Sequence, residues 1–353
     1  MPDTSAPSPA PDLTAHEREL TEPVSLTQPN GRLDTAAIGW ARRPLVDTAG
    51  VAARRGVVTA GWGRNKRWEY WNVITPTHIV SLVVSSLDYA AVHEVWILDR
   101  ATQRTWGRSA TVVPARDVEL PGSLGGGITI ARAKDLVLTV TPAGAGQVWR
   151  LHAQIPDASF DITVTRPAAH DCLAVVVPWT SRLFQYTVKD VALPARGTIT
   201  IDGAVHPVPS GSWAVLDHGR GRWPYDVAWN WGAGSGVLDD GRSIGIQVGA
   251  RWTDGTGSTE NGVLVGGVMH KISQPVTWEY DLRDVMRPWR VTGGGLDAEF
   301  APAHVKRSAM NLGVVSGRTD QCFGTWSGTF AAGDETIAFA GVEGFAEDVH
   351  NRW

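Results

Sequence analysis

The segment richest in groups that could carry chemistry is Asp217–Gly232, which reads DHGRGRWPYDVAWNWG. Asp217 and His218 are candidate catalytic residues, because a carboxyl or an imidazole can donate or accept a proton near neutral pH. Two arginines alternate with glycines after them, and a guanidinium can orient Asp217 or bind an anionic group through paired hydrogen bonds. An interdomain ion-pair network with aromatic packing would use the same residues. The segment's candidate ligand-binding residues are Arg220, Arg222, Trp223, Tyr225, Trp229 and Trp231.

A second segment, Gly61–Val73, reads GWGRNKRWEYWNV. As a strand it places Lys66, Trp68 and Tyr70 on one face, because side chains alternate along a strand. These three residues are candidates for a pocket wall of cations and aromatic rings. The alternative is a strand whose charged side chains reach solvent while its tryptophans fill the core.

The third candidate catalytic residue is Glu260, which offers a carboxylate. It precedes Asn261-Gly262, a dipeptide typical of tight hairpin turns. A glutamate beside a turn at the mouth of a barrel could face a cavity. The simpler alternative is that Glu260 only leads into the hairpin.

Motifs for common cofactors are missing from the sequence. It contains no GxxxxGK[ST] phosphate loop, no strand-linked GxGxxG, no GxSxG elbow and no HExxH. His93-Glu94 has no second histidine at helical spacing, and no CxxC occurs. We therefore expect no cofactor and no stable metal site.

The overall composition favours a cytoplasmic protein with no nucleic-acid partner and no stable membrane insertion. The chain has 353 residues, a net charge of -4 and two distant cysteines, which suits a reducing compartment. Residues 1–23 lack the basic start and apolar stretch of a signal peptide. They are rich in Pro, Ala, Ser and acids, so we expect a disordered arm.

The local patterns predict an all-β fold of two lipocalin-like antiparallel barrels or sandwiches with few short helices. Alternating apolar residues indicate strands at 147–155, 160–165, 244–252 and 276–282. Asp202-Gly203, Asp240-Gly241 and Asp254-Gly255 are further expected turns. A short helical turn is expected near 303–312, and 341–353 is expected to form a last strand that closes a barrel.

Two domains are expected because one core rarely organises a chain of this length. We predict a first domain at 24–212 and a second at 213–353. The division lies between His206 and Asp226, where Trp, Gly and Asp-Gly turns become denser, with an error of about 15 residues.

Four ordered motifs resemble a bacterial family, domain-of-unknown-function family 2804: GWGRNKRWEYWNV, DHGRGRWPYDVAWNWG, WTDGTGSTENG and the ending EDVHNRW. The resemblance covers nearly the whole chain after Pro23 and carries no established function. A more distant resemblance links Gly211–His218 (GSWAVLDH) and Ala228–Gly241 to the hydroxyneurosporene synthase (carotenoid hydratase) and AttH-like proteins. TWSG at 325–328 and GFAEDVH at 344–350 are similar to later elements of the same proteins.

This second resemblance implies two lipocalin-like domains with a hydrophobic pocket between or inside them. It also implies that Asp217 and His218 are acid/base residues and that Trp229 and Trp231 are pocket aromatics. The chain departs from the pattern where Gly-Arg-Gly-Arg-Trp-Pro follows Asp-His, and where Ser327 replaces a glutamate after Trp326. The added arginines favour a ligand with a polar or anionic part.

Three functions remain open on this evidence. The first is a cofactor-independent hydratase, cyclase or isomerase that acts on a lipophilic small molecule. The second is a non-catalytic binder or carrier of a lipid-like metabolite, because a small closed barrel can hold one ligand. The third is carbohydrate binding or hydrolysis, which needs two carboxylates across a cleft. The sequence does not indicate the oligomeric state.

Overall fold

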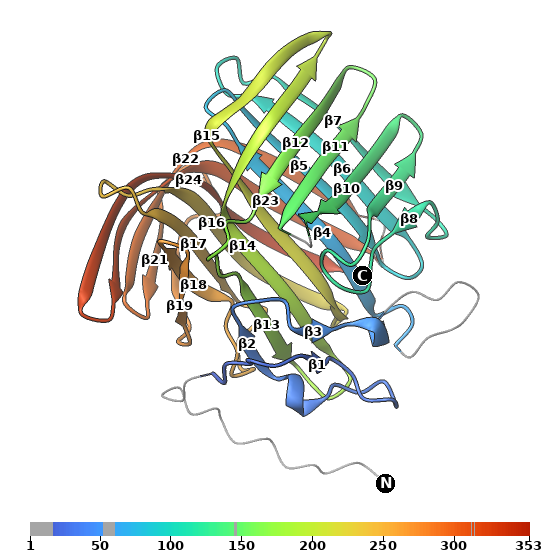
Figure 1. The fold of residues 1–353 in the computed structure, drawn as a ribbon. Coiled ribbons are helices and arrows are strands. Elements are labelled where there is room, and N and C mark those ends of the chain that lie inside the picture. Colours follow the sequence, from blue (N-terminus) through green and yellow to red (C-terminus); the bar gives the residue numbers. More distant parts are fainter. Residues whose placement is uncertain (1–16, 52–60, 145–146, 312, 314) are drawn as a thin grey trace.

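The protein is built almost entirely from antiparallel strands in two large, strongly curled sheets, each a half-barrel (Figure 1). The computed structural model describes residues 17–51, 61–144, 147–311, 313 and 315–353. Within these residues, the only helical segments are two 3-10 turns, Thr35–Ala37 and Ala49–Val51. No helix in the described part is long and apolar enough to cross a membrane. The predicted all-β, two-barrel fold class is confirmed.

The first sheet has 13 strands, and most of them follow the order β7-β6-β5-β4-β15-β14-β12-β11-β10-β9-β8, with β13 and β2 attached beside β14. Its strands are β2 (Gly39–Ala41), β4 (Asn65–Ile74), β5 (His78–Ser86), β6 (Ala91–Asp99), β7 (Thr105–Val112), β8 (Val118–Glu119), β9 (Thr129–Ala133), β10 (Leu136–Ala143), β11 (Val148–Gln154), β12 (Ala158–Thr165), β13 (Leu173–Pro178), β14 (Phe184–Ile201) and β15 (Ala204–Arg222). A separate parallel pair joins β1 (Val24–Ser25) and β3 (Val46–Asp47).

The second sheet has nine strands in the order β19-β18-β17-β16-β24-β23-β22-β21-β20. Its strands are β16 (Asp226–Val237), β17 (Ser243–Ala250), β18 (Asn261–Val265), β19 (Val268–Ile272), β20 (Thr277–Glu279), β21 (Trp289–Gly293), β22 (Leu296–Asn311), β23 (Ser316–Ala332) and β24 (Glu335–Arg352). The predicted C-terminal strand is therefore present as β24, but it lies in the middle of the sheet instead of closing a barrel.

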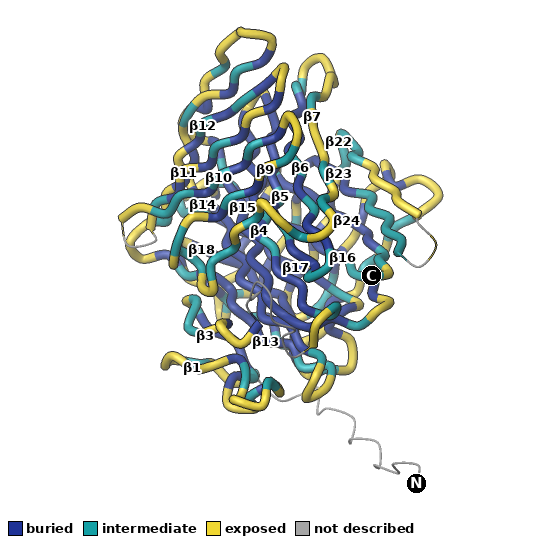
Figure 2. The backbone as a smooth tube through the Cα atoms, turned by 90° about the vertical axis from the view of Figure 1, so that its right-hand side faces the viewer, coloured by how far each residue is buried: buried dark blue, intermediate teal, exposed yellow. Residues whose placement is uncertain are grey.

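Strand alternation creates three large apolar layers, and a smaller fourth cluster, which includes Leu26 and Phe184, joins the N-terminal segment to β13 and β14. The concave side of the first sheet holds one core, which includes Trp71 and Trp149, and the second sheet has its own core around Trp289 and Trp326. The opposite faces of the two sheets meet in a third cluster, rich in tryptophan. Figure 2 shows buried backbone running through the middle of the molecule, while many of the hairpin tips are exposed. This tryptophan-rich apolar layer between the sheets positions the candidate site.

The chain passes from the first sheet to the second between Arg222 and Asp226. The predicted boundary at 212/213 thus falls inside β15, which runs on to Arg222 as a partner of β14 and β4. Of the expected disordered arm, residues 1–16 lie outside the described residues. Residues 17–23 are ordered: Leu20 donates a backbone hydrogen bond to Trp40, and Glu17 forms a buried ion pair with Lys271.

Two local predictions are wrong. Residues 303–311 belong to the long strand β22 and form no helical turn, because pairing with β23 along 296–311 overrides the local composition. Asn261-Gly262 opens strand β18, and the turn lies instead at Gly266-Gly267. The predicted turn at Asp202-Gly203 is confirmed, and both residues have positive φ angles.

Candidate functional site

A buried lysine and two carboxylates meet where the two sheets face each other. Lys189 on β14 lies with its Nζ 3.0 Å from Asp217 Oδ2 and 3.4 Å from Glu260 Oε2. Asp217 belongs to β15 of the first sheet, whereas Glu260 directly precedes β18 of the second. Two of the three predicted catalytic residues therefore converge, and they do so on a cation that the sequence analysis had not selected.

Strand register and two glycines create this convergence. Lys189 lies directly opposite Asp217 in the β14–β15 pair. A Cβ atom on Gly219 would come within 2.2 Å of the Trp68 ring, and a Cβ on Gly249 would come within 2.0 Å of Glu260 Oε1. Because real Cβ atoms do not approach so closely, glycine at both positions gives Trp68 and Glu260 the space they occupy.

A third carboxylate, Glu347 on β24, completes the group. The three carboxylates share one feature: each accepts a hydrogen bond from an indole N–H. The pairs are Trp68 with Asp217 at 2.9 Å, Trp252 with Glu260 at 2.5 Å and Trp229 with Glu347 at 3.0 Å. Indole N–H groups are donors only, so they fix the carboxylate oxygens without supplying a compensating charge. We call Lys189, Asp217, Glu260 and Glu347 the inter-sheet cluster.

The pKa of Glu347 is raised to about 7, well above the ordinary value of a glutamate. Burial is the largest cause, and the negative charge of Asp217 adds to it. The hydrogen bond from Trp229 and the charge of Lys189 oppose the rise only in part. Glu347 therefore exchanges a proton near neutral pH, as a general acid or base requires.

The charges of the cluster are unequal, because one ammonium faces three carboxyl groups. Burial opposes the charge on Lys189, but Asp217 and Glu260 outweigh it and raise the pKa of the lysine. Burial also raises the pKa of Glu260, an effect that Lys189 reduces and Asp217 reinforces. The cluster therefore holds a permanent cation and tends to retain a proton on a glutamate.

Gln321 connects Glu347 to a phenol. Its Nε2 donates to Glu347 Oε2 at 2.9 Å and to the hydroxyl oxygen of Tyr70 at 3.2 Å. Because the Tyr70 oxygen accepts this bond, its own hydrogen is left to be donated elsewhere. Burial, together with the charge of Glu347, raises the pKa of Tyr70, so the phenol stays protonated.

Aromatic rings surround the cluster. The ring of Trp231 lies 3.8 Å from Lys189 Nζ in a cation–π contact and 5.7 Å from the ring of Tyr70. Trp223 stacks on Trp252 at 5.6 Å and contacts Trp68 edge-on at 5.4 Å. Several of these rings keep accessible surface although they pack against the inter-sheet core: Trp68, Tyr70, Trp179, Trp229 and Trp353. The predicted pocket aromatics of β4 and β16, together with Trp223 directly after β15, thus share one region.

His218 is not part of this region. It follows Asp217 on β15, so alternation turns it to the concave side of the first sheet, opposite Glu69 on β4. It is completely buried, and burial followed by the charge of Arg220 lowers its pKa well below the ordinary value. Of the two predicted acid/base residues, Asp217 therefore lies at the cluster and His218 on the opposite face of β15.

The two arginines also point away from Asp217. Arg220 donates to the backbone oxygens of Trp68 and Pro121, at 2.8 Å and 2.9 Å. Arg222 donates to Asn65 Oδ1 at 3.0 Å and to two backbone oxygens. The prediction that an arginine orients Asp217 or recognises an anion here is corrected: both guanidinium groups hold loops against the first sheet.

The remaining predicted residues lie at the margin. Lys66 Nζ lies over the Trp353 ring at 5.4 Å, and burial lowers its pKa to about 8. Tyr225 is exposed and lies near the guanidinium of Arg64 at 5.6 Å. Trp223 donates its indole hydrogen to Gln185 Oε1 at 2.6 Å. Of this group, only Trp223 contacts the rings around the cluster closely.

Lys189 and Glu347 are the functional residues that the sequence reasoning missed. Lys189 belongs to an otherwise mostly apolar stretch of β14, where a buried charge is a detectable signal. Glu347 lies in the C-terminal FAEDVH motif, where no property of the sequence distinguishes it from Asp348. The role of Glu347 depends on the side chains that face it from the other sheet, and only the tertiary structure brings these side chains near it.

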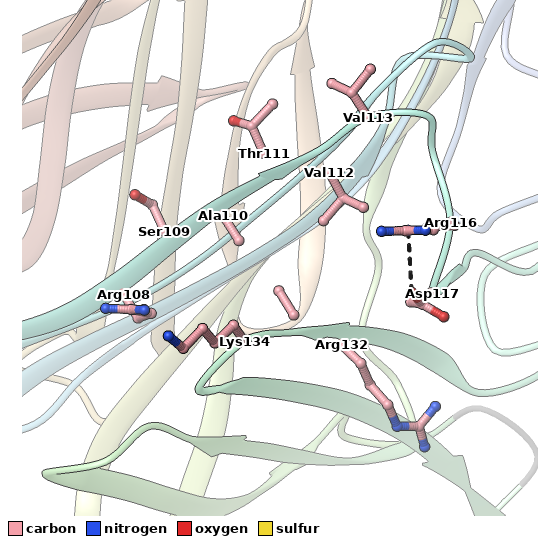
Figure 3. A pocket seen from close by; sticks show the side chains of 11 residues that line it. Arg108, Ser109, Ala110, Thr111, Val112, Val113, Arg116, Asp117, Arg132 and Lys134 are labelled. Carbon is pink, nitrogen blue, oxygen red and sulfur yellow. Dashed lines mark ion pairs between the residues drawn. The ribbon is translucent and has the colours of Figure 1, made fainter.

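Two surface pockets lie away from the cluster. One, of about 550 Å³, follows β7 and the β9–β10 turn (Figure 3). The other, of about 540 Å³, lies between the N-terminal residues Glu17 and Glu19, the β19 strand and the β23–β24 turn. In the described part of the chain, no three His, Cys, Asp or Glu side chains are arranged to hold a metal ion.

Comparison with known proteins places this geometry in a family. No curated protein matches the chain. An AttH-like protein from Nitrosomonas europaea is 14% identical, with a TM-score of 0.50 over 81% of this chain and 92% of that chain. Kievitone hydratase from Nectria haematococca is 11% identical, with a TM-score of 0.49 over 84% and 93%. CghA is 9% identical, with a TM-score of 0.48 over 86% and 94%.

The match to the AttH-like protein shows that the fold of two half-barrels is shared. The family model of DUF2804, a domain of unknown function, matches residues 17–353, which include the inter-sheet cluster and both sheets. The chain therefore belongs to the DUF2804 family.

Proposed function

We propose that the protein is a cofactor-independent acid–base enzyme of the hydratase, cyclase or isomerase type. Its substrate is a lipophilic small molecule with a polar, hydrogen-bonding end. The observation that carries the proposal is Glu347: a carboxyl with a pKa of about 7, buried among aromatic rings beside an ion-paired carboxylate. Such a group can donate a proton at neutral pH where water is scarce.

Protonated Glu347 would transfer its proton to an alkene carbon of the substrate. The positive charge that then develops on the substrate is stabilised by aromatic faces such as those of Tyr70 and Trp231, which border the cluster. In a hydration, water adds its oxygen to the cation and loses a proton. In a cyclisation or isomerisation, an internal bond forms or a neighbouring proton leaves.

Asp217 is the group placed to accept that proton. It is ion-paired with Lys189, and it accepts hydrogen bonds from Thr187 Oγ1 at 2.9 Å and from Trp68. In each turnover Glu347 loses one proton and Asp217 gains one. Proton exchange with solvent then restores the starting protonation state of both carboxyl groups. Because the arginines point elsewhere, the polar end of the substrate is expected to carry a hydroxyl-type donor for these carboxylates.

A test follows from the proton balance. Purified protein is incubated in D₂O with a lipid extract of the cells that produce it, and products are followed by mass spectrometry. Catalysis by Glu347 attaches one solvent deuteron to substrate carbon. Glu347→Gln is expected to lower this rate by about 10²–10⁴-fold, whereas a change of the exposed Glu279→Gln leaves it unchanged.

The second candidate is a non-catalytic carrier of a lipid-like molecule, favoured by the partly accessible rings alone. In that case a compound copurifies with the protein and is recovered without carbon-bound deuterium. Equal labelling by the wild type and the Glu347→Gln variant would reject Glu347 as the proton donor.

A further inference from the structure

The free edge of the first sheet carries a groove that is separate from the inter-sheet cluster. Among the described strands, β7 pairs only with β6, so its other edge exposes backbone N–H and C=O groups. Six consecutive residues, 108–113, line the pocket of about 550 Å³ along this edge. The opposite wall is formed by Arg132, Ala133 and Lys134 at the β9–β10 turn.

The groove is strongly basic, although the whole chain has a net charge of -4. Four of its eleven lining residues are cations and one is an acid: Arg108, Arg116, Arg132, Lys134 and Asp117. One more acid lies at its end, where Asp135 bridges to Arg108 at 3.3 Å, and both of these side chains are 43% exposed. The other end is bounded by Arg116 and Asp117, whose charged atoms are 3.8 Å apart.

The cations do not converge on one point. Figure 3 shows Arg108 and Lys134 at one end of the groove and Arg116 at the other, with the β7 backbone between them. A single phosphate or carboxylate could not contact both ends. An elongated partner could, because six residues of extended chain span about 17–20 Å at roughly 3.3 Å per residue.

We propose that this groove binds an acidic peptide segment in extended conformation, which adds to the edge of β7 as a further strand. Backbone hydrogen bonds to β7 provide affinity for any extended chain. The basic side chains at both ends select acidic residues in that chain. The partner is therefore a protein with an exposed acidic strand or tail, and this binding is independent of the chemistry at Glu347.

The test uses a fluorescein-labelled peptide of about six residues that alternates glutamate and threonine, matched to the groove length at ~3.3 Å per residue. Binding to the full chain is measured by fluorescence anisotropy at low salt. A lysine–threonine peptide and a glutamate–threonine peptide with alternate amides N-methylated serve as ligand controls. We expect binding only of the unmethylated acidic peptide, and weaker binding as salt screens the charges.

The double variant Arg132→Glu with Lys134→Glu should weaken binding by about tenfold or more, because attraction becomes repulsion along one wall of the groove. Both residues are exposed, so the fold is retained. Arg283→Glu, whose side chain is 90% exposed on the second sheet's side, is the matched control and should bind normally. Equal binding of the N-methylated peptide, displacement by millimolar inorganic phosphate or equal binding of a short oligonucleotide would each overturn the proposal.

Discussion

The two faces of β15 use charge in opposite ways. Toward the second sheet, Asp217 shares one lysine with Glu260 and lies among rings that keep accessible surface. Toward the concave side, Arg220 and Arg222 donate mainly to backbone oxygens and anchor loops. The difference shows that the density of polar residues in 217–232 reflects two tasks, and that alternation along a strand separates them.

The largest effect is expected when Lys189, the cation that Asp217 and Glu260 share, is removed. Lys189→Met leaves Asp217 and Glu260 buried without their ion-pair partner, and removal of one partner of a buried pair typically costs about 3–5 kcal/mol. We expect a loss of this size in the free energy of unfolding, measured by urea denaturation at pH 7.

A variant on the other face of β15 provides the control. Arg220→Lys keeps a positive charge on the concave side and should cost less than Lys189→Met. If Lys189→Met is neutral or stabilising at pH 7, the cluster is not the charge-sensitive element described here.

Glu347 should make stability depend on pH in an unusual direction. Its pKa is about 7 in the folded protein and 4.5 in an ordinary glutamate, so the folded state binds the extra proton between these values. The free energy of unfolding contributed by Glu347 therefore falls as pH rises through this window. Glu347→Gln should gain stability relative to the wild type with rising pH, by up to about 3 kcal/mol above pH 7.

Denaturation of the wild type and the variant at a series of pH values between acid and neutral measures this difference. A difference that stays constant with pH would contradict the raised pKa of Glu347.

His218 should produce the opposite slope. Its folded pKa lies well below 6.5, so the unfolded state binds the extra proton and the wild type loses stability as pH falls below that value. His218→Leu, of similar volume, should cost less than about 1.5 kcal/mol at pH 8 and should gain stability relative to the wild type as the pH falls below 6.5.

The same pH series measured on His218→Leu reports this slope, and catalysis at the cluster should keep its pH profile. A shift in that pH profile would indicate that His218 takes part in the chemistry of the cluster.

The sequence was sufficient to predict the all-β class, because alternation is visible locally in strands such as β11 and β12. It also placed Lys66, Trp68 and Tyr70 on one face of β4, as alternation along the observed strand requires. Local patterns failed where tertiary pairing decides, as at Asn261-Gly262 and at residues 303–311.

The candidate site was only partly predictable. Asp217 and Glu260 were identified, but nothing along the chain links them to Lys189 or Glu347, because Lys189 and Asp217 lie in the first sheet and Glu260 and Glu347 in the second. The arginines were misassigned because the Gly-Arg-Gly-Arg pattern suggests two guanidinium groups aimed at one ligand. Their common direction was correct, but it is toward the loops of the first half-barrel.

The single passage of the chain between sheets, at residues 223–225, has a consequence for how this protein can be divided. Neither half-barrel expressed alone would retain both the ammonium and all of the carboxyl groups, so the proposed chemistry is a property of the junction. Insertions or fusions at the exposed hairpin tips leave the junction intact. A change in the length of this short connector would instead displace Lys189 and Asp217 relative to Glu260 and Glu347.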